Sequence, residues 1–314
     1  MERDVIVREV GPRDGLQLVG TVLPTATKLA WIRAEAAAGV SEIEVCSFVP
    51  PKVVPQFGDA KDVAAGALAI PNIVVTALVP NIKGAEIGFA AGVHKLNYVL
   101  SVSQTHNQKN VRRTREQSLA DLAEIVRLRN DDPRYENVLI GCGLSTSFGC
   151  SLEGHVPARE TLSVMEQVLA LGVDEITLAD TVGHGAPGQV REIFRAALQL
   201  AGGLPLVAHF HDTRGLGLAN AHAALEEGCR RFDASLAGLG GCPFAPGATG
   251  NIVTEDLIFL LEAEGLKTGI DLPALGEVRA IVELALPGEA MHGTILKAGL
   301  PKGFVAATPR LAAE

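Results

Sequence analysis

The sequence lacks the features that mark secreted, membrane or disulfide-rich proteins. Of its 314 residues only five are cysteines, namely Cys46, Cys142, Cys150, Cys229 and Cys242. They form no C-x-x-C pair and their number is odd, which is typical of a reducing compartment. The N-terminus opens with charged residues, and no apolar run is long enough to span a membrane. We therefore expect a cytoplasmic protein with no membrane partner.

Positive charge is also scarce. The chain has 27 Lys and Arg residues against 36 Asp and Glu, and its formal net charge is −9. A surplus of acid disfavours nucleic acid as a partner. The one basic cluster is Arg112-Arg113-Thr114-Arg115. We interpret it as the solvated start of a helix, and a site for an anionic cofactor tail stays open as the alternative.

What the sequence does contain is a regular alternation of strand and helix patterns. Hydrophobic residues make up 47% of the chain, enough for a large core. Longer Ala- and Leu-rich amphipathic stretches, such as 26–38, 115–129 and 158–171, separate short β-branched runs. Several helical patterns end in Gly-Val, which is typical of a helix C-cap followed by a strand. The predicted strands span 5–9, 42–46, 73–77, 95–99, 138–144, 175–179, 206–211 and 231–234.

Eight strand–helix repeats predict an α/β protein of the (β/α)₈ TIM-barrel class. An open doubly wound sheet is the alternative, but the turn after its first strand is usually a glycine-rich nucleotide site. Here that turn reads Gly11-Pro12-Arg13-Asp14-Gly15, which lacks the required spacing. No linker divides the chain. We therefore predict one catalytic domain over 1–314, with additional C-terminal helices from about 271–314 as an appendage.

Two histidines lie two residues apart in the predicted seventh strand, which reads Val207-Ala208-His209-Phe210-His211-Asp212. Residues i and i+2 of a strand face the same side, so His209 and His211 share a face and Phe210 takes the other. In a barrel, this places both imidazoles inside, near the carboxyl ends of the strands where catalytic groups collect. The alternative is two core histidines held by hydrogen bonds, but the pair at a strand end favours a metal or catalytic role.

Two neutral imidazoles need an anionic partner to hold a hard divalent ion. Asp14 follows the first strand and lies at the same end of the barrel, although Asp-Gly is also ordinary turn chemistry. Asn251, in the glycine-rich segment after the eighth strand, offers a neutral oxygen as a fourth ligand. Asp14, His209, His211 and Asn251 together favour Mg²⁺ or Mn²⁺, since a structural zinc site would use thiolates.

Three further residues are candidates for the chemistry. Arg13 lies beside Asp14 and is suited to stabilise charge that develops on a substrate oxygen. Glu44 is a carboxylate inside an apolar strand and needs a partner, either Arg13, a water on the metal or a basic residue of a helix. Cys242 lies in the glycine-rich segment 238–251, which we interpret as a mobile loop over the site. Its thiol could act as an acid or base.

Five motifs in this order resemble the 3-hydroxy-3-methylglutaryl-CoA (HMG-CoA) lyase family of metal-dependent barrel lyases and Claisen-condensing enzymes. The motifs are EVGPRDGLQ (9–17), EVCSFVPPKVVPQ (44–56), ADTVGHGAPG (179–188), HFHDTRGLGLAN (209–220) and GLGGCPFAPGATGN (238–251). The resemblance implies retro-Claisen cleavage of a tertiary 3-hydroxyacyl-CoA to acetyl-CoA and a second product, which is acetoacetate for the family's usual substrate. Such an enzyme would serve leucine degradation or ketone-body formation.

The resemblance also implies roles for individual residues. Asp14, His209, His211 and Asn251 correspond to the metal ligands, and Asp14 or His209 to the base. Arg13 corresponds to the group that stabilises the enolate, Cys242 to a loop thiol in proton transfer, and Glu44 to a supporting carboxylate. Asp180 and Thr181 match a supporting pair at the end of the sixth strand.

The sequence departs from the family pattern near the expected substrate. Leu18-Val19-Gly20 stands where many relatives read Asn-Glu-Lys, and Gln104 stands in place of a glutamate. These changes keep open a lyase for citramalyl-CoA or a longer branched hydroxyglutaryl-CoA. A condensing synthase of the same superfamily and a barrel that has lost catalysis are weaker alternatives. We expect a homodimer or higher homo-oligomer, the commonest arrangement of soluble enzymes.

Overall fold

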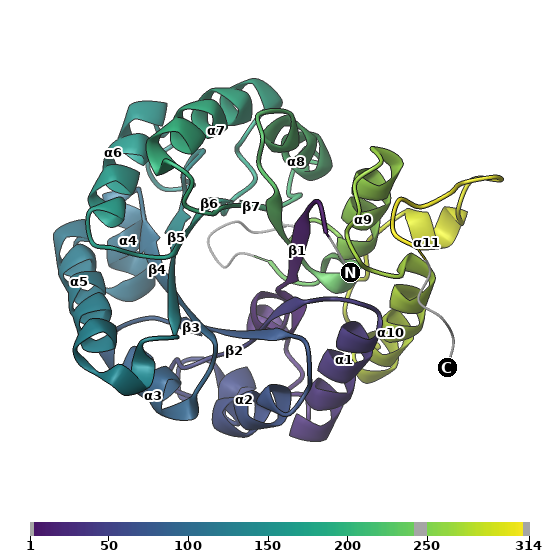
Figure 1. The fold of residues 1–314 in the computed structure, drawn as a ribbon, viewed down its shortest axis with the longest axis horizontal. Helices are drawn as coiled ribbons and strands as arrows, with labels where there is room; N and C mark the ends of the chain where they lie inside the picture. Colours follow the sequence, from purple (N-terminus) through teal and green to yellow (C-terminus); the bar gives the residue numbers. More distant parts are fainter. Residues whose placement is uncertain (1–2, 242–249, 310–314) are drawn as a thin grey trace.

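The computed structural model describes residues 3–241 and 250–309 and forms a closed barrel of eight parallel strands (Figure 1). Each strand pairs with the next in sequence, and β8 pairs with β1. This closure confirms the predicted (β/α)₈ barrel and excludes the open doubly wound sheet. The strands are β1 Ile6–Glu9, β2 Glu42–Ser47, β3 Val74–Val79, β4 Lys95–Ser101, β5 Leu139–Ser145, β6 Glu175–Asp180, β7 Leu206–Phe210 and β8 Arg231–Ala234.

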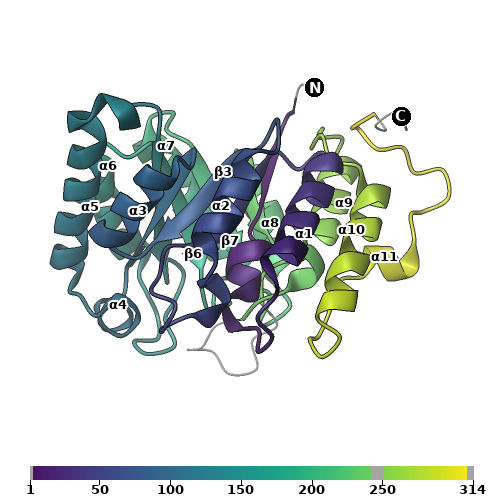
Figure 2. The same ribbon diagram turned by 90° about the horizontal axis from the view of Figure 1, so that it is seen from below.

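Helices surround the barrel and cover the outward faces of the strands (Figure 1). Figure 2 places α4 at the end of the barrel opposite the N-terminus, which is the end where the strands finish. We call this end the mouth. The helices are α1 Thr25–Ala37, α2 Ala60–Leu68, α3 Ile82–Ala91, α4 Gln104–Val111, α5 Arg115–Asp131, α6 Ala158–Leu169, α7 Pro187–Ala201, α8 Gly217–Glu226, α9 Thr254–Ala263, α10 Leu272–Ala285 and α11 Ile295–Ala298.

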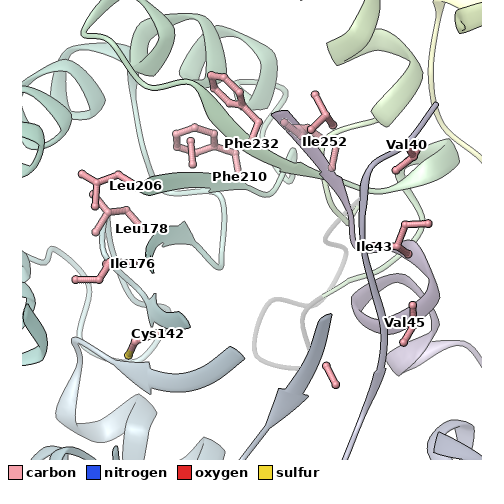
Figure 3. Close-up of a cluster of buried hydrophobic side chains, with 14 of the residues drawn as sticks. Val40, Ile43, Val45, Cys142, Ile176, Leu178, Leu206, Phe210, Phe232 and Ile252 are labelled. Atoms are coloured by element: carbon pink, nitrogen blue, oxygen red, sulfur yellow. The ribbon is translucent and has the colours of Figure 1, made fainter. Parts of the chain in front are cut away.

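The main hydrophobic core lies between the strands and these helices. Cys142, Leu178, Phe210 and Phe232 are buried and point away from the barrel axis (Figure 3). Phe210 packs against two further phenylalanines, with ring centroids 5.6 and 6.3 Å apart. Apolar side chains therefore alternate with inward-facing residues, and this alternation leaves the interior free for polar groups.

The turns between helix and strand follow the Gly-Val pattern of the sequence. Gly39, Gly92 and Gly172 adopt φ values of 99°, 74° and 83°. A side chain would be strained in this left-handed conformation, so glycine ends each helix and releases the chain into the next strand. The predicted helix start at the basic cluster is also confirmed, because Thr114 caps α5.

All strands but β8 differ from their predicted bounds by one or two residues, and the difference at β7 bears on the site. β7 ends at Phe210, and His211 lies one residue beyond it in an isolated bridge with Asn251. The reason is that pairing between β7 and β8 ends at His209 and Asp233. Beyond this point Ile252, in the segment after β8, donates its backbone N–H to the Phe210 carbonyl at 3.1 Å. The bridge brings His211 and Asn251 together.

The C-terminal helices lie on one side of the barrel. α10 packs against α1 and α9, and α11 packs against α9 (Figures 1 and 2). These are the residues expected as an appendage, and the treatment of 1–314 as one domain stays a prediction. Among the described residues, no helix has both the length and the apolar character that crossing a bilayer requires.

The amino-terminal half of the barrel interior is filled by a network of buried charges, which we call the floor. Lys95 Nζ lies 2.6 Å from Glu42 and 2.8 Å from Glu175, and Arg8 Nη1 lies 2.8 Å from Glu175. Arg8 also binds Asp233 through Nε at 2.7 Å and Nη2 at 2.9 Å. The members are Arg8, Glu42, Lys95, Glu175, Arg231 and Asp233. Because cations and anions balance, the floor closes this end of the barrel.

Candidate metal centre and active site

Asp14, His209 and His211 meet at the mouth of the barrel. Asp14 lies in the helical turn Gly11–Gly15 that follows β1, and the two histidines lie at the end of β7. The Asp14 Oδ2 atom is 3.8 Å from His209 Nε2 and 3.6 Å from His211 Nε2. Ligand atoms of all three residues lie within 4.8 Å of one another. This spacing leaves room for one ion between them.

Asn251 completes this group from the segment after β8. Its Nδ2 donates to Asp14 Oδ2 at 2.9 Å, and its Oδ1 is buried without a hydrogen-bond partner among the described residues. A buried polar atom without a partner is costly unless something binds it. The structure therefore brings together all four residues predicted as ligands, and it leaves an unused oxygen among them.

This donor set fits a divalent cation. One carboxylate, two imidazoles and one amide oxygen supply oxygen and nitrogen donors and a single negative charge. Such a set, with positions left for substrate oxygens, suits Mg²⁺ or Mn²⁺ better than a closed zinc site. The turn that carries Asp14 is well anchored, because the Asp14 N–H donates to the Val10 carbonyl at 2.7 Å.

Arg13 is fixed beside the same group by two carboxylates. Its Nε donates to Glu44, and its Nη1 donates to Asp14 at 2.6 Å. Glu44 is also held by Asn97 Nδ2 at 2.8 Å. Of the alternatives considered for Glu44, the Arg13 partnership is therefore the one observed. Within the described chain Arg13 Nη2 makes no hydrogen bond, and Arg13 lines the cavity, so this N–H group is available to a ligand.

The charges of the site favour an ionised Asp14. Burial opposes ionisation of this carboxyl, but the Arg13 guanidinium and the two imidazoles outweigh burial and hold its pKa well below its usual range. Burial also disfavours a charged His209, but Asp233 and Asp14 raise the pKa of this imidazole. The site is thus set up to present an anionic carboxylate to a cation.

Asp233 is a functional residue that the sequence analysis missed. It lies in β8, and its Oδ2 is 3.1 Å from His209 Nδ1. A carboxylate on the far nitrogen fixes the ring orientation of a metal-binding histidine and directs Nε2 to the metal. A usable signal was present, because Asp233 alternates with the buried Phe232 and must face inward. The same alternation predicts that Asn97 in β4 also faces the barrel interior.

A cavity of about 400 Å³ opens at the mouth beside these residues. Its polar part includes Arg13, Asp14, Glu44, His209 and His211. Its apolar part comes from residues on the side of β2, β3 and the turn after β1. These apolar residues include Leu18, Val49, Val53, Val54, Leu78 and Pro80. The cavity thus joins a charged reaction centre to an apolar wall, as substrate sites commonly do.

The remaining predicted residues lie in different places. Cys242 lies outside the described residues. Asp180 accepts hydrogen bonds from the N–H groups of His184 and Gly185 at 2.8 and 2.9 Å, so it holds the loop after β6. Thr181 lines the cavity and accepts from the Thr146 N–H at 2.9 Å. Both residues therefore lie at the end of β6, the strand beside β7, and fix the loops next to the site.

The two departures from the family pattern separate in the structure. Leu18 is 45% exposed and lines the cavity. Gln104 is directed elsewhere, because its Oε1 accepts from the Arg115 N–H at 2.9 Å at the start of α5. Arg115 also lies 3.5 Å from Glu160, and Arg113 lies 2.9 Å from Asp121. Of the two changes, only the one at Leu18 alters the surface of the cavity.

Comparison with known proteins now assigns the family. The sequence matches the HMGL-like family over residues 4–282. This chain belongs to the HMGL-like family. It is 40% identical to the hydroxymethylglutaryl-CoA lyase of Bacillus subtilis over 273 residues, which is 87% of this chain and 90% of that protein. It is 39% identical to the (R)-citramalyl-CoA lyase of Chloroflexus aurantiacus over 281 residues, covering 86% of this chain and 87% of that protein.

A solved structure supports the same assignment. The HMG-CoA lyase of Acinetobacter baumannii, in complex with coenzyme A and 3-methylmalate, superposes with a TM-score of 0.89 and 44% identity. The match covers 96% of this chain and 97% of that one. The chain is therefore a carbon–carbon lyase of the HMG-CoA lyase type. Because relatives of similar identity act on different acyl-CoA compounds, the family alone does not fix the substrate.

Proposed function

We propose that this HMGL-like lyase cleaves 3-hydroxy-3-methylglutaryl-CoA to acetyl-CoA and acetoacetate, using Mg²⁺ or Mn²⁺. The convergence of Asp14, His209, His211 and Asn251 beside Arg13 in one cavity carries the proposal. A divalent ion held by the four ligands would act as a Lewis acid toward the substrate hydroxyl and carboxylate oxygens.

The protein's own residues supply the remaining steps. Asp14 and His209 would both border a substrate hydroxyl at the metal site, and either is a candidate to accept its proton. His209 Nδ1 donates a hydrogen bond to Asp233, so His209 could accept only through Nε2, the nitrogen that also serves as a ligand. Asp14 has a second carboxylate oxygen for this proton. As the C2–C3 bond breaks, its electron pair forms an enolate of acetyl-CoA.

Arg13 meets the negative charge of this enolate. Glu44 and Asp14 fix the guanidinium through Nε and Nη1, so Nη2 can donate to the thioester oxygen without reorganisation. A proton delivered to the enolate carbon then gives acetyl-CoA. We assign this proton to Cys242, a role that rests on the family resemblance and stays a prediction, as does the homo-oligomeric state.

The direct test is acetyl-CoA release from HMG-CoA, first with EDTA and then with Mg²⁺ or Mn²⁺ added back. We expect turnover on the order of 1 per second or faster only with metal. Turnover that is unaffected by EDTA would contradict the proposed metal role. Failure to release acetyl-CoA, with or without metal, would contradict the proposed substrate.

Citramalyl-CoA is the second candidate substrate. The relative from Chloroflexus aurantiacus that is named for this activity is 39% identical, within one percentage point of the Bacillus subtilis enzyme. Leu18 also gives the cavity an apolar surface where the family pattern is polar. Citramalyl-CoA would give pyruvate instead of acetoacetate, so identification of the second product separates the two candidates. Acetyl-CoA consumption with a 2-oxo acid would instead reveal a condensing enzyme.

A further inference from the structure

The cavity extends beside the metal-binding residues on the side of β4 and β5. In the middle of these strands Asn97, Val99 and Gly143 are partly accessible, while Cys142 and Leu144 are fully buried. Strand residues alternate between faces, so the accessible residues look into the barrel. All three line the cavity. The open space therefore reaches past the mouth into the barrel interior.

The tilt of the strands sets the level of this space. Side chains at one level on strands n and n+2 of a tilted barrel are offset from the pairing register. In the floor, Lys95 pairs through β3 with Glu44, but its side chain binds Glu42, two residues earlier.

The same two-residue offset applies between β5 and β7. Gly143 pairs with Thr177, and His209 pairs with Ala179 two residues further along β6. Gly143 therefore lies at the level of His209, beside the metal-binding residues, and Thr177 next to it accepts a hydrogen bond from Arg8 of the floor.

Packing does not account for the glycine at position 143. A Cβ atom there would meet one described atom outside its chain neighbours within 4 Å, the Tyr98 carbonyl oxygen at 3.8 Å, which is an ordinary contact. Gly141 on the same strand differs, since its Cβ would lie 2.5 Å from Asn97 Oδ1. Glycine in a strand interior is destabilising. At position 141 glycine is needed because the Asn97 side chain lies close to the strand. At position 143 no described side chain lies close, and glycine only leaves space open.

The acid part of the substrate is the part nearest this space. The floor closes the barrel below, and the large, charged nucleotide of coenzyme A must remain outside the mouth. The acyl chain therefore enters first, with C3 at the metal-binding residues and its substituents directed toward Gly143. In a methyl-substituted substrate, the space beside Gly143 would stay empty of substrate.

We propose that Gly143 is a specificity-determining residue that lets this lyase accept 3-hydroxyacyl-CoA substrates whose C3 substituent is longer than methyl. The inference rests on the proposed lyase function and defines its substrate class. Methyl, ethyl and propyl homologues of HMG-CoA, substituted at C3, are the appropriate probes. One methylene in a fitted pocket changes kcat/KM by about 10- to 200-fold.

The experiment compares the native enzyme with Gly143→Ala and Gly143→Val on this series with Mg²⁺. We expect the native enzyme to cleave the propyl homologue with a kcat/KM at least equal to that for HMG-CoA. Gly143→Ala should lower kcat/KM for the propyl homologue about tenfold more than for HMG-CoA, and Gly143→Val should increase this difference. Gly188→Ala is the matched control, because Gly188 lies at the start of α7 with nothing within 4 Å of its Cβ. It should leave all ratios unchanged.

Three outcomes would overturn the inference while leaving the lyase function intact. The first is discrimination by the native enzyme against the propyl homologue of tenfold or more. The second is an equal loss of activity on all homologues in the Gly143 variants. The third is a Gly188→Ala enzyme whose ratios shift as much as those of the Gly143 variants. Loss of folding is monitored by the melting temperature, and the Cβ atom that both variants add makes only an ordinary contact. If the native enzyme releases acetyl-CoA from no member of the series, the proposed function itself fails.

Discussion

The floor and the mouth of this barrel use the same kinds of residue in opposite ways. In the floor, Lys95 bridges Glu42 and Glu175, and Arg8 donates two hydrogen bonds to Asp233. At the mouth, Asn251 Oδ1 and His211 Nδ1 are buried without hydrogen-bond partners among the described residues. Arg231 Nε of the floor also makes no hydrogen bond among the described residues, but it lies 3.1 Å from a Glu175 oxygen as an ion pair. The charges of the floor are therefore paired without a ligand, whereas the two atoms at the mouth have no counterpart.

This difference distinguishes buried charges that stabilise the fold from buried groups that are available to a ligand. A buried ion network whose members satisfy one another closes and stabilises the barrel, although its net contribution to stability is small. A buried group with unused donors or acceptors retains a cost that a ligand can remove. Asp233 joins the two regions, because it binds Arg8 on one side and His209 on the other.

The largest effect should come from breaking the floor. Lys95→Met leaves Glu42 and Glu175 with fewer buried cations, and an uncompensated buried charge costs about 3–5 kcal/mol. We expect this loss in the free energy of unfolding, measured by urea denaturation, with Mn²⁺ affinity of the folded protein preserved. Lys95→Arg keeps the charge and is the control. A Lys95→Met protein of native stability would show that the floor does not hold the barrel together.

Arg13→Gln should produce the next largest effect, and it should fall on catalysis. Removing a donor to the developing enolate lowers kcat by about 10²–10³-fold, or roughly 3–4 kcal/mol. Because Arg13 is not a proposed ligand, Mn²⁺ should still bind. Steady-state kinetics and a Mn²⁺ titration check the two parts. If kcat is kept and only KM rises, Arg13 binds the substrate without stabilising the transition state.

Asp233→Asn tests the link between the two regions. An amide can still accept from His209 Nδ1, but its NH₂ group then faces the Arg8 donors, so the ring is less well held. Loss of such a supporting contact lowers metal affinity about 10- to 100-fold. Isothermal titration with Mn²⁺ gives the measurement. Glu42→Gln is the control, since Glu42 contacts Arg8, Lys95 and Arg231 but not His209. Equal effects of both changes on metal affinity would remove any special role for Asp233.

The last prediction concerns protonation, and it is one of direction. Burial raises the pKa of Glu9 to about 8, although hydrogen bonds from Thr254, Leu236 and Gly11 lower it. The floor carboxylates behave differently, because despite burial Arg8 lowers the pKa of Asp233 and, with Lys95, that of Glu175. The folded protein therefore holds a proton on Glu9 that the unfolded chain releases above its ordinary pKa of 4.5.

This proton stabilises the fold below pH 4.5, and its contribution is lost as pH rises toward 8. Glu9→Gln removes the titrating group, so its melting temperature should fall less than that of the native protein between pH 5 and pH 8. Parallel curves for the two proteins would show that Glu9 is ionised in the folded state.

Much of this arrangement could be predicted from the sequence. The alternation of eight strands and helices, the Gly-Val turns and the His-x-His spacing are local patterns, and the barrel topology follows from them. The spacing also predicted that His209 and His211 face Asp14, because all three follow or end barrel strands. The end of β7 at Phe210 was not predicted, since it depends on pairing with Ile252, more than 40 residues away in sequence.

The missed features depend on contacts between distant residues. Alternation with Phe232 predicts that Asp233 faces inward, but its contact with His209 becomes evident only when β8 is placed beside β7. The opposite behaviour of Gly141 and Gly143 depends on whether the side chain of Asn97, more than 40 residues away, occupies the space above each. The ligand, base and acid roles of the site residues, including Cys242, stay predictions until tested.

Direct Mn²⁺ binding tests, without reference to any substrate, whether the mouth holds one divalent ion as we propose. Electron paramagnetic resonance of free Mn²⁺ should show one site per chain in the native protein. Affinity should fall about 100-fold or more in Asp14→Ala, which removes the single carboxylate among the ligands, and remain native in Lys95→Arg. Equal Mn²⁺ affinity of the native protein and Asp14→Ala would contradict the account.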